Sequence, residues 1–260
     1  MDPLLEVRGI SRSFGGVQAI RDCSLTAGKG QVTGIIGPNG AGKSTLFNLI
    51  TGFLEPDRGE IHFNGEQITG WAAHRIARRG LVRTFQVPQG FPGLTVFENM
   101  LAAPRMDVGE SAWQAVGWQL LKPGRLKRAA TVIDEARHLL QKVGLWEKRN
   151  QLVKNLSPGE GRMLEIARQL MLHPQMILLD EPTAGVHPIL RERLTDLLRE
   201  LRREFSIGIV LIEHNLSFIM NLSDVIFVLN RGSVIAHGAP EEISRDPKVI
   251  EIYLGGGRLA

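Results

Sequence analysis

A glycine-rich segment near the N-terminal end carries a lysine and two hydroxyl side chains, a combination suited to phosphate binding. It reads Gly37-Pro38-Asn39-Gly40-Ala41-Gly42-Lys43-Ser44-Thr45 and matches the pattern G-x-x-x-x-G-K-[ST]. Its glycines let the backbone approach an anion closely, with N–H groups pointing inward. Lys43 can reach the β- and γ-phosphates, and the Ser44 hydroxyl can ligate Mg²⁺. The segment predicts a site for a nucleoside triphosphate.

The residues on either side of this phosphate loop have the patterns of a strand and a helix. Residues 31–36 form an apolar, β-rich run, and residues 45–50 have a helical pattern. Strand, loop and helix in this order are the context in which the motif is credible. The N-terminus of the helix adds the positive end of its dipole. A glycine-rich turn without a ligand is the alternative, and the flanking pattern disfavours it.

Two adjacent acids, Asp180 and Glu181, follow the apolar run Met176–Leu179. The carboxyl ends of strands in an open parallel sheet are where ligands bind. We expect Asp180 to hold Mg²⁺ through a water molecule and Glu181 to orient or deprotonate an attacking water. Alone, this motif also fits a strand that ends in a solvated acidic turn. Downstream of a phosphate loop, the catalytic interpretation is favoured.

A third motif, Leu156-Ser157-Pro158-Gly159-Glu160, comes just before a long helical pattern. Ser157 and Glu160 have the spacing of a capping box, and proline suits the first helical position. The segment therefore predicts a well-formed helix N-terminus. Such a terminus is also able to bind an anion.

Length and composition indicate a globular α/β protein. The chain has 260 residues, of which 43% are hydrophobic and 22% charged, with a net charge of +4. This charge permits a basic face but requires none. The single cysteine, Cys23, excludes an internal disulfide framework, fits a reducing compartment and is expected to be a small buried hydrophobe. We see no signal peptide and no apolar run long enough to span a bilayer.

The elements that must position these motifs follow from hydrophobic periodicity. Predicted strands cover residues 4–11, 22–27, 31–36, 59–63, 81–84, 176–179, 207–212, 225–229 and 233–236, and predicted helices cover 72–79, 125–143, 163–172, 189–203 and 216–221. Short apolar strands that alternate with helices indicate a parallel sheet covered on both faces. We expect one domain over 1–260. Its nucleotide-binding core and β subdomain would take 1–94 and 175–254, a helical insertion 95–174, and a flexible tail 255–260.

The ordered motifs resemble the ATP-binding cassette of an ABC transporter over about residues 4–254. The family order is a phosphate loop, a glutamine at the junction with the insert, a signature, a carboxylate pair and a switch histidine. In this chain the glutamine is Gln86, in Arg83-Thr84-Phe85-Gln86, and the histidine is His214, after Ile212-Glu213. The resemblance implies a P-loop NTPase core with a mostly parallel sheet, an N-terminal antiparallel β subdomain and an inserted α-helical subdomain. It also implies ATP and Mg²⁺ as cofactors.

The resemblance further implies roles for matching residues. Phe14 would stack on adenine, with a core aromatic as the alternative, and Ser157 and Gly159 would contact the γ-phosphate bound by an opposite cassette. The remaining ATP contacts would come from Gly37, Pro38, Asn39, Gly40, Ala41, Gly42, Lys43, Ser44 and Thr45. Metal contacts would come from Ser44, Gln86 and Asp180, and catalytic groups from Glu181, His214, Lys43 and Gln86.

Three residues depart from the family pattern. The usual signature has glycine and glutamine where this chain has Pro158 and Glu160. A carboxylate beside a triphosphate is unfavourable unless it folds back onto the Ser157 N–H. His187 stands where the family often has aspartate, in a loop that faces the partner cassette. These departures argue against a full contribution of this subunit's signature to ATP hydrolysis, and a heterodimer with unequal sites would tolerate them.

Within the family, the chain is similar to ATPase subunits of branched-chain or neutral amino-acid importers. The segments that carry this similarity are Ile68–Gly70, His74–Gly80, Arg83–Gln86, Arg125–Arg128, Ile212–Asn215 and Val249–Gly255. Urea importers and lipopolysaccharide exporters are alternatives, and a soluble cassette ATPase acting on DNA or ribosomes is a more distant one. Expected partners are a second ABC cassette, integral membrane permease subunits and, indirectly, a solute-binding protein, without nucleic acid. The expected location is cytoplasmic, on the inner face of the membrane.

Two surface features remain open in the sequence. An apolar group formed by Phe91, Leu94, Val96 and Phe97 is a candidate dock for a permease helix, with ordinary packing of the insert as the alternative. Arginines at 75, 78, 79, 83, 199, 202 and 203 are interpreted as solvated helix faces or ion-pair partners rather than a nucleic-acid surface.

Overall fold

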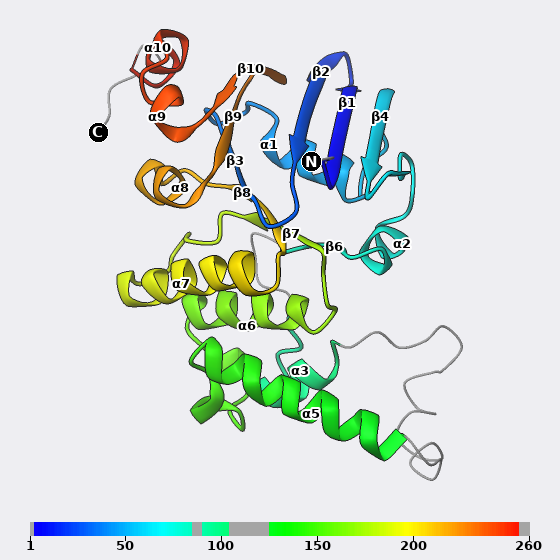
Figure 1. The fold of residues 1–260 in the computed structure, drawn as a ribbon, viewed down its shortest axis with the longest axis vertical. Coiled ribbons are helices and arrows are strands. Elements are labelled where there is room, and N and C mark those ends of the chain that lie inside the picture. The colour runs from blue at the N-terminus through cyan, green and yellow to red at the C-terminus, as the bar shows by residue number, and fades with distance from the viewer. Residues whose placement is uncertain (1–2, 85–89, 104–124, 255–260) are drawn as a thin grey trace. The chain divides into compact units, whose positions relative to one another are not determined.

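The computed structural model describes residues 3–84, 90–103 and 125–254, and its chain divides into two compact units. The first unit comprises Met1–Gln86, Pro174–Ala184 and Leu198–Ala260 (Figure 1). The second comprises Val87–His173 and Gly185–Leu197. The predicted limits of the helical insertion, 95 and 174, stay a prediction.

An antiparallel sheet of four strands opens the first unit, in the order β2-β1-β4-β5. Its strands are β1 (Leu5–Phe14), β2 (Val17–Ala27), β4 (Arg58–Phe63) and β5 (Glu66–Gln67). Asn64 and Gly65 both have positive φ and join β4 to β5, as the predicted hairpin requires. The predicted antiparallel β subdomain is confirmed.

A second sheet of six strands has the order β10-β9-β3-β8-β7-β6. The phosphate loop follows β3 in this sheet, and Asp180 ends β7. Its strands are β3 (Val32–Ile36), β6 (Leu81–Arg83), β7 (Met176–Asp180), β8 (Gly208–Ile212), β9 (Val225–Asn230) and β10 (Ser233–Gly238). All neighbouring pairs are parallel except β9 with β10. Every residue of β3, β7 and β8 is buried, which is why these strands are nearly continuous apolar runs in the sequence. The predicted α/β fold is confirmed.

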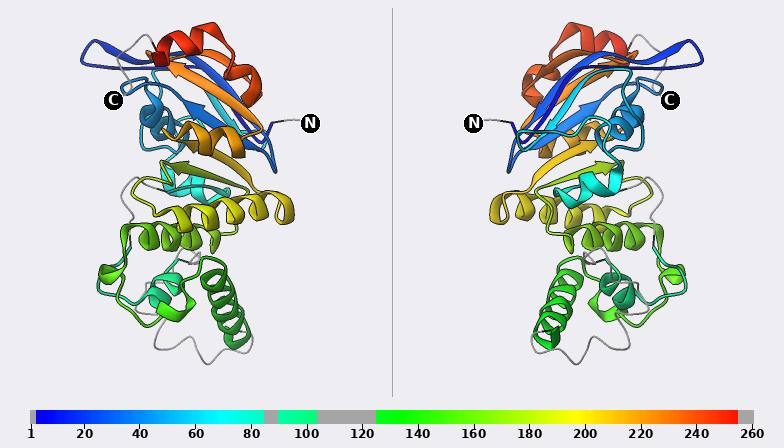
Figure 2. Two further views of the ribbon diagram at one scale, coloured as in Figure 1. Left: turned by 90° about the vertical axis from the view of Figure 1, so that its left-hand side faces the viewer. Right: turned by 90° about the vertical axis from the view of Figure 1, so that its right-hand side faces the viewer.

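The helices of the first unit are α1 (Lys43–Ile50), α2 (Ala73–Arg78), α8 (Leu216–Leu222), α9 (Pro240–Ile243) and α10 (Pro247–Leu254). One hydrophobic core joins side chains of both sheets with those of α1, such as Leu46 and Phe47. Figure 2 shows α9 and α10 in red beside the strands β9 and β10. Neither α9 nor α10 was predicted, because their short apolar patterns resemble a loop.

The second unit is helical, as its sequence pattern predicts. It contains α3 (Val96–Leu101), α5 (Arg125–Lys142), α6 (Pro158–Leu170) and the 3₁₀ turns η2 (Trp146–Lys148) and η3 (Val153–Asn155), and α7 (Pro188–Glu204) has residues in both units. Its buried side chains include Met100, Leu140 and Ile166. The pairs α3 with α5, α3 with α6 and α5 with α6 pack together.

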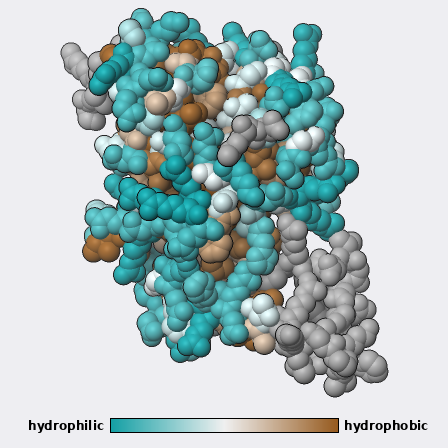
Figure 3. Space-filling view, viewed as in Figure 1, coloured by the Kyte–Doolittle hydropathy of each residue, from teal (hydrophilic) through white to brown (hydrophobic). Residues whose placement is uncertain are grey.

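Two further predictions concern a membrane-spanning segment and the C-terminal tail. The face drawn in Figure 3 is mostly hydrophilic, with small scattered hydrophobic areas. Within the described part of the chain, no helix has both the length and the apolar character needed to cross a bilayer. The predicted flexible tail, residues 255–260, lies outside the described residues.

Candidate functional site

The phosphate loop joins β3 to α1 and leaves the first turn of that helix open. Gly42 is the N-cap residue with φ 102°, and no side chain caps the helix. A Cβ at Gly42 would lie 2.6 Å from the Ala19 carbonyl oxygen, so this position requires glycine. The first N–H groups of a helix have no partner within it. An uncapped helix start therefore offers donors to an anion, which fits a phosphate group.

Lys43 adds a buried cation at this loop. Its Nζ donates to the carbonyl oxygens of Gly37 at 2.8 Å and Pro38 at 3.0 Å, and the residue is 7% exposed. Burial lowers the pKa of Lys43, while the nearby charges of Glu181 and Asp180 act to raise it. The lysine is thus held close to both acids of the predicted site.

A cavity of about 650 Å³ lies beside residues 38–41 of the phosphate loop. Its lining residues are Pro38, Asn39, Gly40, Ala41, Asn230, Arg231, Ile235, Lys248, Glu251 and Ile252. These residues come from the loop, from the end of β9 and the turn after it, from β10 and from α10. The C-terminal helix therefore lies close to the phosphate loop, which the sequence did not indicate.

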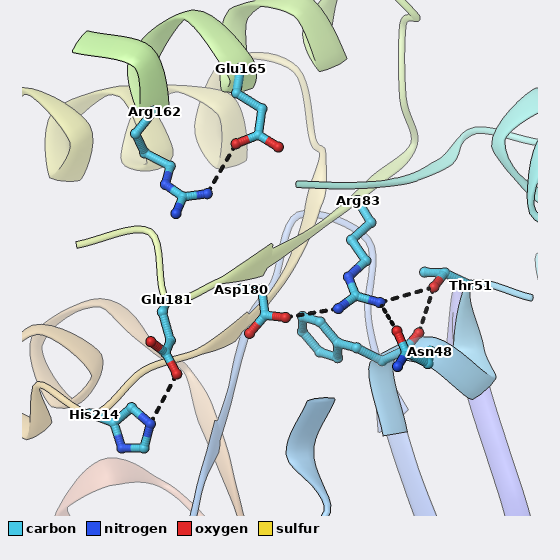
Figure 4. A network of polar contacts seen from close by, with 9 residues as sticks. Asn48, Thr51, Arg83, Arg162, Glu165, Asp180, Glu181 and His214 are labelled. Carbon is cyan, nitrogen blue, oxygen red and sulfur yellow. Dashed lines mark hydrogen bonds and ion pairs between the residues drawn. The ribbon is translucent and has the colours of Figure 1, made fainter. Parts of the chain in front are cut away.

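Asp180 ends β7 and is paired with Arg83, which ends the neighbouring strand β6. An Nη2 of Arg83 lies 2.8 Å from Oδ2 of Asp180, and the two side chains are 7% and 6% exposed. The other terminal nitrogen of Arg83 donates to Oδ1 of Asn48 at 2.6 Å (Figure 4). Sequence reasoning assigned Arg83 only to a group of ion-pair partners or solvated faces, and it missed this contact with the predicted metal-binding acid.

Glu181 and His214 meet at the carboxyl edge of the parallel sheet. Oε1 of Glu181 lies 3.0 Å from Nε2 of His214 (Figure 4). Glu181 has φ 48°, an uncommon conformation for a residue other than glycine. Its N–H donates to the Ile212 carbonyl oxygen at 2.9 Å, which ties the turn after β7 to β8. The structure thus brings these two predicted residues together.

Glu213 is a residue at this edge that sequence reasoning missed. Its buried carboxylate accepts from the N–H groups of Thr183 at 2.8 Å, His214 at 3.1 Å and Asn215 at 3.4 Å. These bonds connect the loop after β7 with the loop after β8. An acid directly after an apolar strand was the available signal.

Phe14 lies at the end of β1 and Gln86 lies outside the described residues. The Phe14 side chain is 43% exposed, and the guanidinium carbon of Arg12 is 5.1 Å from its ring centroid. An exposed aromatic at this position is free to stack on a flat ligand. The structure therefore disfavours the alternative of a core aromatic.

The signature motif lies in the second unit and forms the predicted capping box. The Ser157 N–H donates to Oε2 of Glu160 at 3.0 Å, and the Glu160 N–H donates to the Ser157 hydroxyl at 3.4 Å. Burial acts to raise the pKa of Glu160, but hydrogen bonds from Lys148 and Ser157 outweigh it and hold this pKa below its usual value. The carboxylate is folded back onto the cap, as we expected for a tolerated acid.

Gly159 and His187 occupy different settings in the same unit. Gly159 is buried, and a Cβ there would lie 3.0 Å from Cδ1 of Leu190. His187 is exposed, and its carbonyl oxygen accepts from the N–H of Arg191 at 3.0 Å at the start of α7. A larger residue at position 159 would therefore require the end of the Leu190 side chain to shift.

The four residues of the predicted apolar dock after Gln86 differ in their exposure. Val96 is fully buried, and the Phe97 ring packs edge-on against Trp146 at 6.1 Å between centroids. Phe91 is 49% exposed, with the Arg168 guanidinium 5.3 Å from its ring. Val96 and Phe97 thus fit the alternative of ordinary packing, while Phe91 stays accessible, and the docking role stays a prediction.

The acids present fit a metal that arrives with a nucleotide. Among the described residues, no three His, Cys, Asp or Glu side chains converge on one point. Ser44, which is exposed, and Asp180 supply one hydroxyl and one carboxylate. Mg²⁺ commonly binds through one or two carboxylates together with substrate phosphates and waters. This donor set therefore suits Mg²⁺ and is too small for an independent metal centre.

Comparisons with known proteins identify the family of the chain. A family model described as "ABC transporter" matches residues 20–184, and one described as "Branched-chain amino acid ATP-binding cassette transporter" matches residues 233–258. The chain is 41% identical over 254 residues to the high-affinity branched-chain amino acid transport ATP-binding protein LivG of Salmonella typhimurium, covering 97% of this chain and 98% of LivG. It is also 41% identical to the corresponding protein BraF of Pseudomonas aeruginosa, with the same coverage.

Solved structures give the same result for the fold. A nucleotide-free ATP-binding cassette from an ABC transporter superposes with a TM-score of 0.82 at 37% identity, covering 97% of this chain and 99% of the other. An ATP-binding cassette in its ADP conformation gives 0.82 at 36% identity, covering 98% and 100%. Nucleotide binding follows from this family, and the uncapped start of α1 is compatible with it. The chain belongs to the ABC transporter ATP-binding family, whose members hydrolyse ATP.

Proposed function

We propose that this chain powers a membrane importer of branched-chain or neutral amino acids by ATP-driven closure of two cassettes. The observation that carries the proposal is the grouping of Lys43, Asp180, Glu181 and His214 around the uncapped start of α1. The substrate class is supported by the names of LivG and BraF and by the model that matches residues 233–258. A carrier of amino acids needs an energy source, and ATP hydrolysis supplies it.

The phosphate loop would hold the triphosphate through its N–H groups and Lys43. Gly37, Pro38, Asn39, Gly40, Ala41, Gly42, Ser44 and Thr45 complete this set, and Phe14 would stack on adenine. Base–aromatic stacking is worth about 1–3 kcal/mol per base. Ser44, Asp180 and Gln86 would hold Mg²⁺. When bound, the metal neutralises charge on the β- and γ-phosphates.

Glu181 and His214 would perform the chemistry. Glu181 orients the attacking water and accepts its proton, and general-base help of this kind contributes about 10²–10⁴-fold. His214 donates a hydrogen bond to the γ-phosphate. Their mutual contact of 3.0 Å supports a shared task, since each side chain restrains the other's orientation. Positioning and charge neutralisation account for most catalysis in this class of reaction.

The other half of each ATP site would come from a second cassette. Ser157 and Gly159 of one cassette would contact the γ-phosphate bound by the other. The helix that starts at Ser157 supports this role, because a helix N-terminus favours anions. Permease subunits would hold the pair at the inner face of the membrane, with a solute-binding protein outside.

The proposal is tested by purifying the complex under mild detergent and reconstituting it in sealed vesicles. We expect ATP-dependent uptake of leucine when a leucine-loaded binding protein is present, and no uptake with Glu181→Gln. Uptake of urea instead would contradict the substrate class. Recovery of the chain only with ribosomes or DNA would contradict the transporter role while leaving the ATP site intact.

A further inference from the structure

Arg83 is a buried cation at the predicted magnesium site, and the proposed chemistry assigns it no role. It ends β6, next to β7 in the sheet, and its Nη2 lies 2.8 Å from Oδ2 of Asp180. Both side chains are nearly inaccessible, at 7% and 6% exposed. A buried carboxylate is stable only with a partner cation or hydrogen bonds. Arg83 therefore supplies a buried partner cation for the Asp180 carboxylate.

The same guanidinium also reaches the helix that begins at the phosphate loop. Nη1 donates to Oδ1 of Asn48 at 2.6 Å and lies 3.5 Å from Oγ1 of Thr51. The guanidinium carbon is 5.4 Å from the ring centroid of Phe47. All three partners belong to α1 or directly follow it. Arg83 is thus a rigid link between the acid at the end of β7 and the helix that carries Lys43 and Ser44 (Figure 4).

We propose that Arg83 is the positioning residue of the magnesium site: it anchors Asp180 through Oδ2, leaves Oδ1 for a metal-bound water, and fixes the acid relative to α1. The planar fork of arginine suits this task, because it bonds two partners in one fixed geometry. Residues that hydrogen-bond to a metal-binding side chain orient it, and their replacement weakens metal binding or activity. The inference rests on the Mg²⁺ and ATP binding proposed above.

A second consequence concerns charge. Arg83 offsets the single carboxylate that the donor set offers, so Asp180 attracts a free divalent cation only weakly. The phosphates of a bound nucleotide restore the negative charge that Mg²⁺ needs. Metal binding therefore requires nucleotide at this site, which agrees with the small donor set described above.

The test compares Arg83→Lys with Arg79→Lys in the full chain. Lysine keeps the charge at position 83 but lacks the two separate nitrogens with which Arg83 holds Asp180 and Asn48 in one fixed geometry. Arg79 is a matched control, because it is exposed and pairs with Glu66 at 2.9 Å. ATP binding is measured by calorimetry in EDTA and across a series of Mg²⁺ concentrations. We expect Arg83→Lys to raise the half-saturating Mg²⁺ concentration about 10–100-fold, with ATP affinity in EDTA unchanged and Arg79→Lys like wild type.

A second variant covers the case in which Arg83→Lys does not fold. Asn48→Ala removes the anchor on α1 and leaves the buried ion pair intact, so it keeps the charge balance of the core. We expect a shift of the Mg²⁺ dependence in the same direction but smaller. Wild-type Mg²⁺ dependence in a folded Arg83→Lys, or in Asn48→Ala when the first variant is unfolded, would overturn the inference. Wild-type protein without Mg²⁺-dependent ATP binding would instead contradict the proposed function.

Discussion

Oε1 of Glu181 lies 3.0 Å from Nε2 of His214, although 33 residues separate them in the chain. They meet because β7 and β8 are neighbouring parallel strands in register, with Asp180 beside Ile212. The turn after β7 gives Glu181 a φ of 48°. A residue other than glycine held there costs about 1–3 kcal/mol, and such strain persists where surrounding contacts over-determine it. Here those contacts include the hydrogen bonds that Glu213 accepts.

Replacing Glu181 with glutamine should separate ATP binding from turnover. The amide keeps the size of the side chain but cannot accept the proton of the attacking water. We expect ATPase activity of the assembled complex to fall about 10²–10⁴-fold, while ATP remains bound and the two cassettes stay closed. Turnover and retained nucleotide are measured together. Glu241→Gln, an exposed acid on α9, is the matched control, and normal turnover in Glu181→Gln would exclude Glu181 as the base.

Replacing Lys43 with alanine should weaken ATP binding. A hydrogen bond to a charged group contributes about 1.5–3 kcal/mol, equivalent to about 10–100-fold in affinity. The variant also loses the bonds from Nζ to the carbonyl oxygens of Gly37 and Pro38, so we expect a lower thermal midpoint as well. ATP affinity is therefore measured by calorimetry at a temperature well below that midpoint. Lys29→Ala, at an exposed lysine, is the control; unchanged ATP affinity in Lys43→Ala would contradict the phosphate-loop assignment.

The elements that follow local rules were predictable. Buried strands such as Val32–Ile36 and Gly208–Ile212 read as apolar runs, because both faces of a central parallel strand are covered. Strands β1 and β2 were predicted too short: β1 extends to Phe14 instead of residue 11, and β2 begins at Val17 instead of residue 22. Val17, at the start of β2, is 70% exposed, so no hydrophobic alternation marks it. Pairing with β1 extends the strand there, and pairing is not a local property.

The candidate site also has a part that local sequence patterns predicted and a part that they did not. The phosphate loop, the acids and His214 were found from ordered motifs along the chain. The contact between Arg83 and Asp180 spans 97 residues and depends on β6 lying next to β7. Glu213 likewise acts on the loop at Thr183, 30 residues away. A single sequence carries no signal for strand order, so these supporting contacts required the structure.

Ser157→Ala should have two separable effects, one on stability and one on hydrolysis. It removes the hydroxyl that caps α6, and loss of such a cap costs about 1 kcal/mol in the free energy of unfolding. Thr95→Ala is a matched control, because Thr95 forms a capping box with Glu98 in the same unit. We expect similar losses of stability by urea unfolding for both variants. ATPase activity of the assembled complex should fall only for Ser157→Ala; equal activities would mean that the site facing Ser157 is silent.

Cys23 should be unreactive in the folded protein and should make the fold sensitive to high pH. Its side chain is fully buried, and this burial, with a smaller effect of the Asp22 charge, raises the pKa of the thiol to about 12. The thiolate is the reactive form. We therefore expect no labelling by a disulfide reagent at neutral or mildly alkaline pH until the protein is unfolded in urea.

The sign of the pH effect follows from the direction of this pKa shift. Below the pKa of an unfolded cysteine, the thiol is neutral in both states and the stability is complete. Above it, the unfolded chain loses a proton that the folded chain keeps, so the free energy of unfolding falls by about 1.4 kcal/mol per pH unit. This fall continues until the pH reaches the folded pKa of about 12. Urea unfolding of wild type and Cys23→Ala from pH 8 upward measures the difference. Parallel curves for the two proteins would contradict the raised pKa of Cys23, because only the difference between the curves reports the thiol.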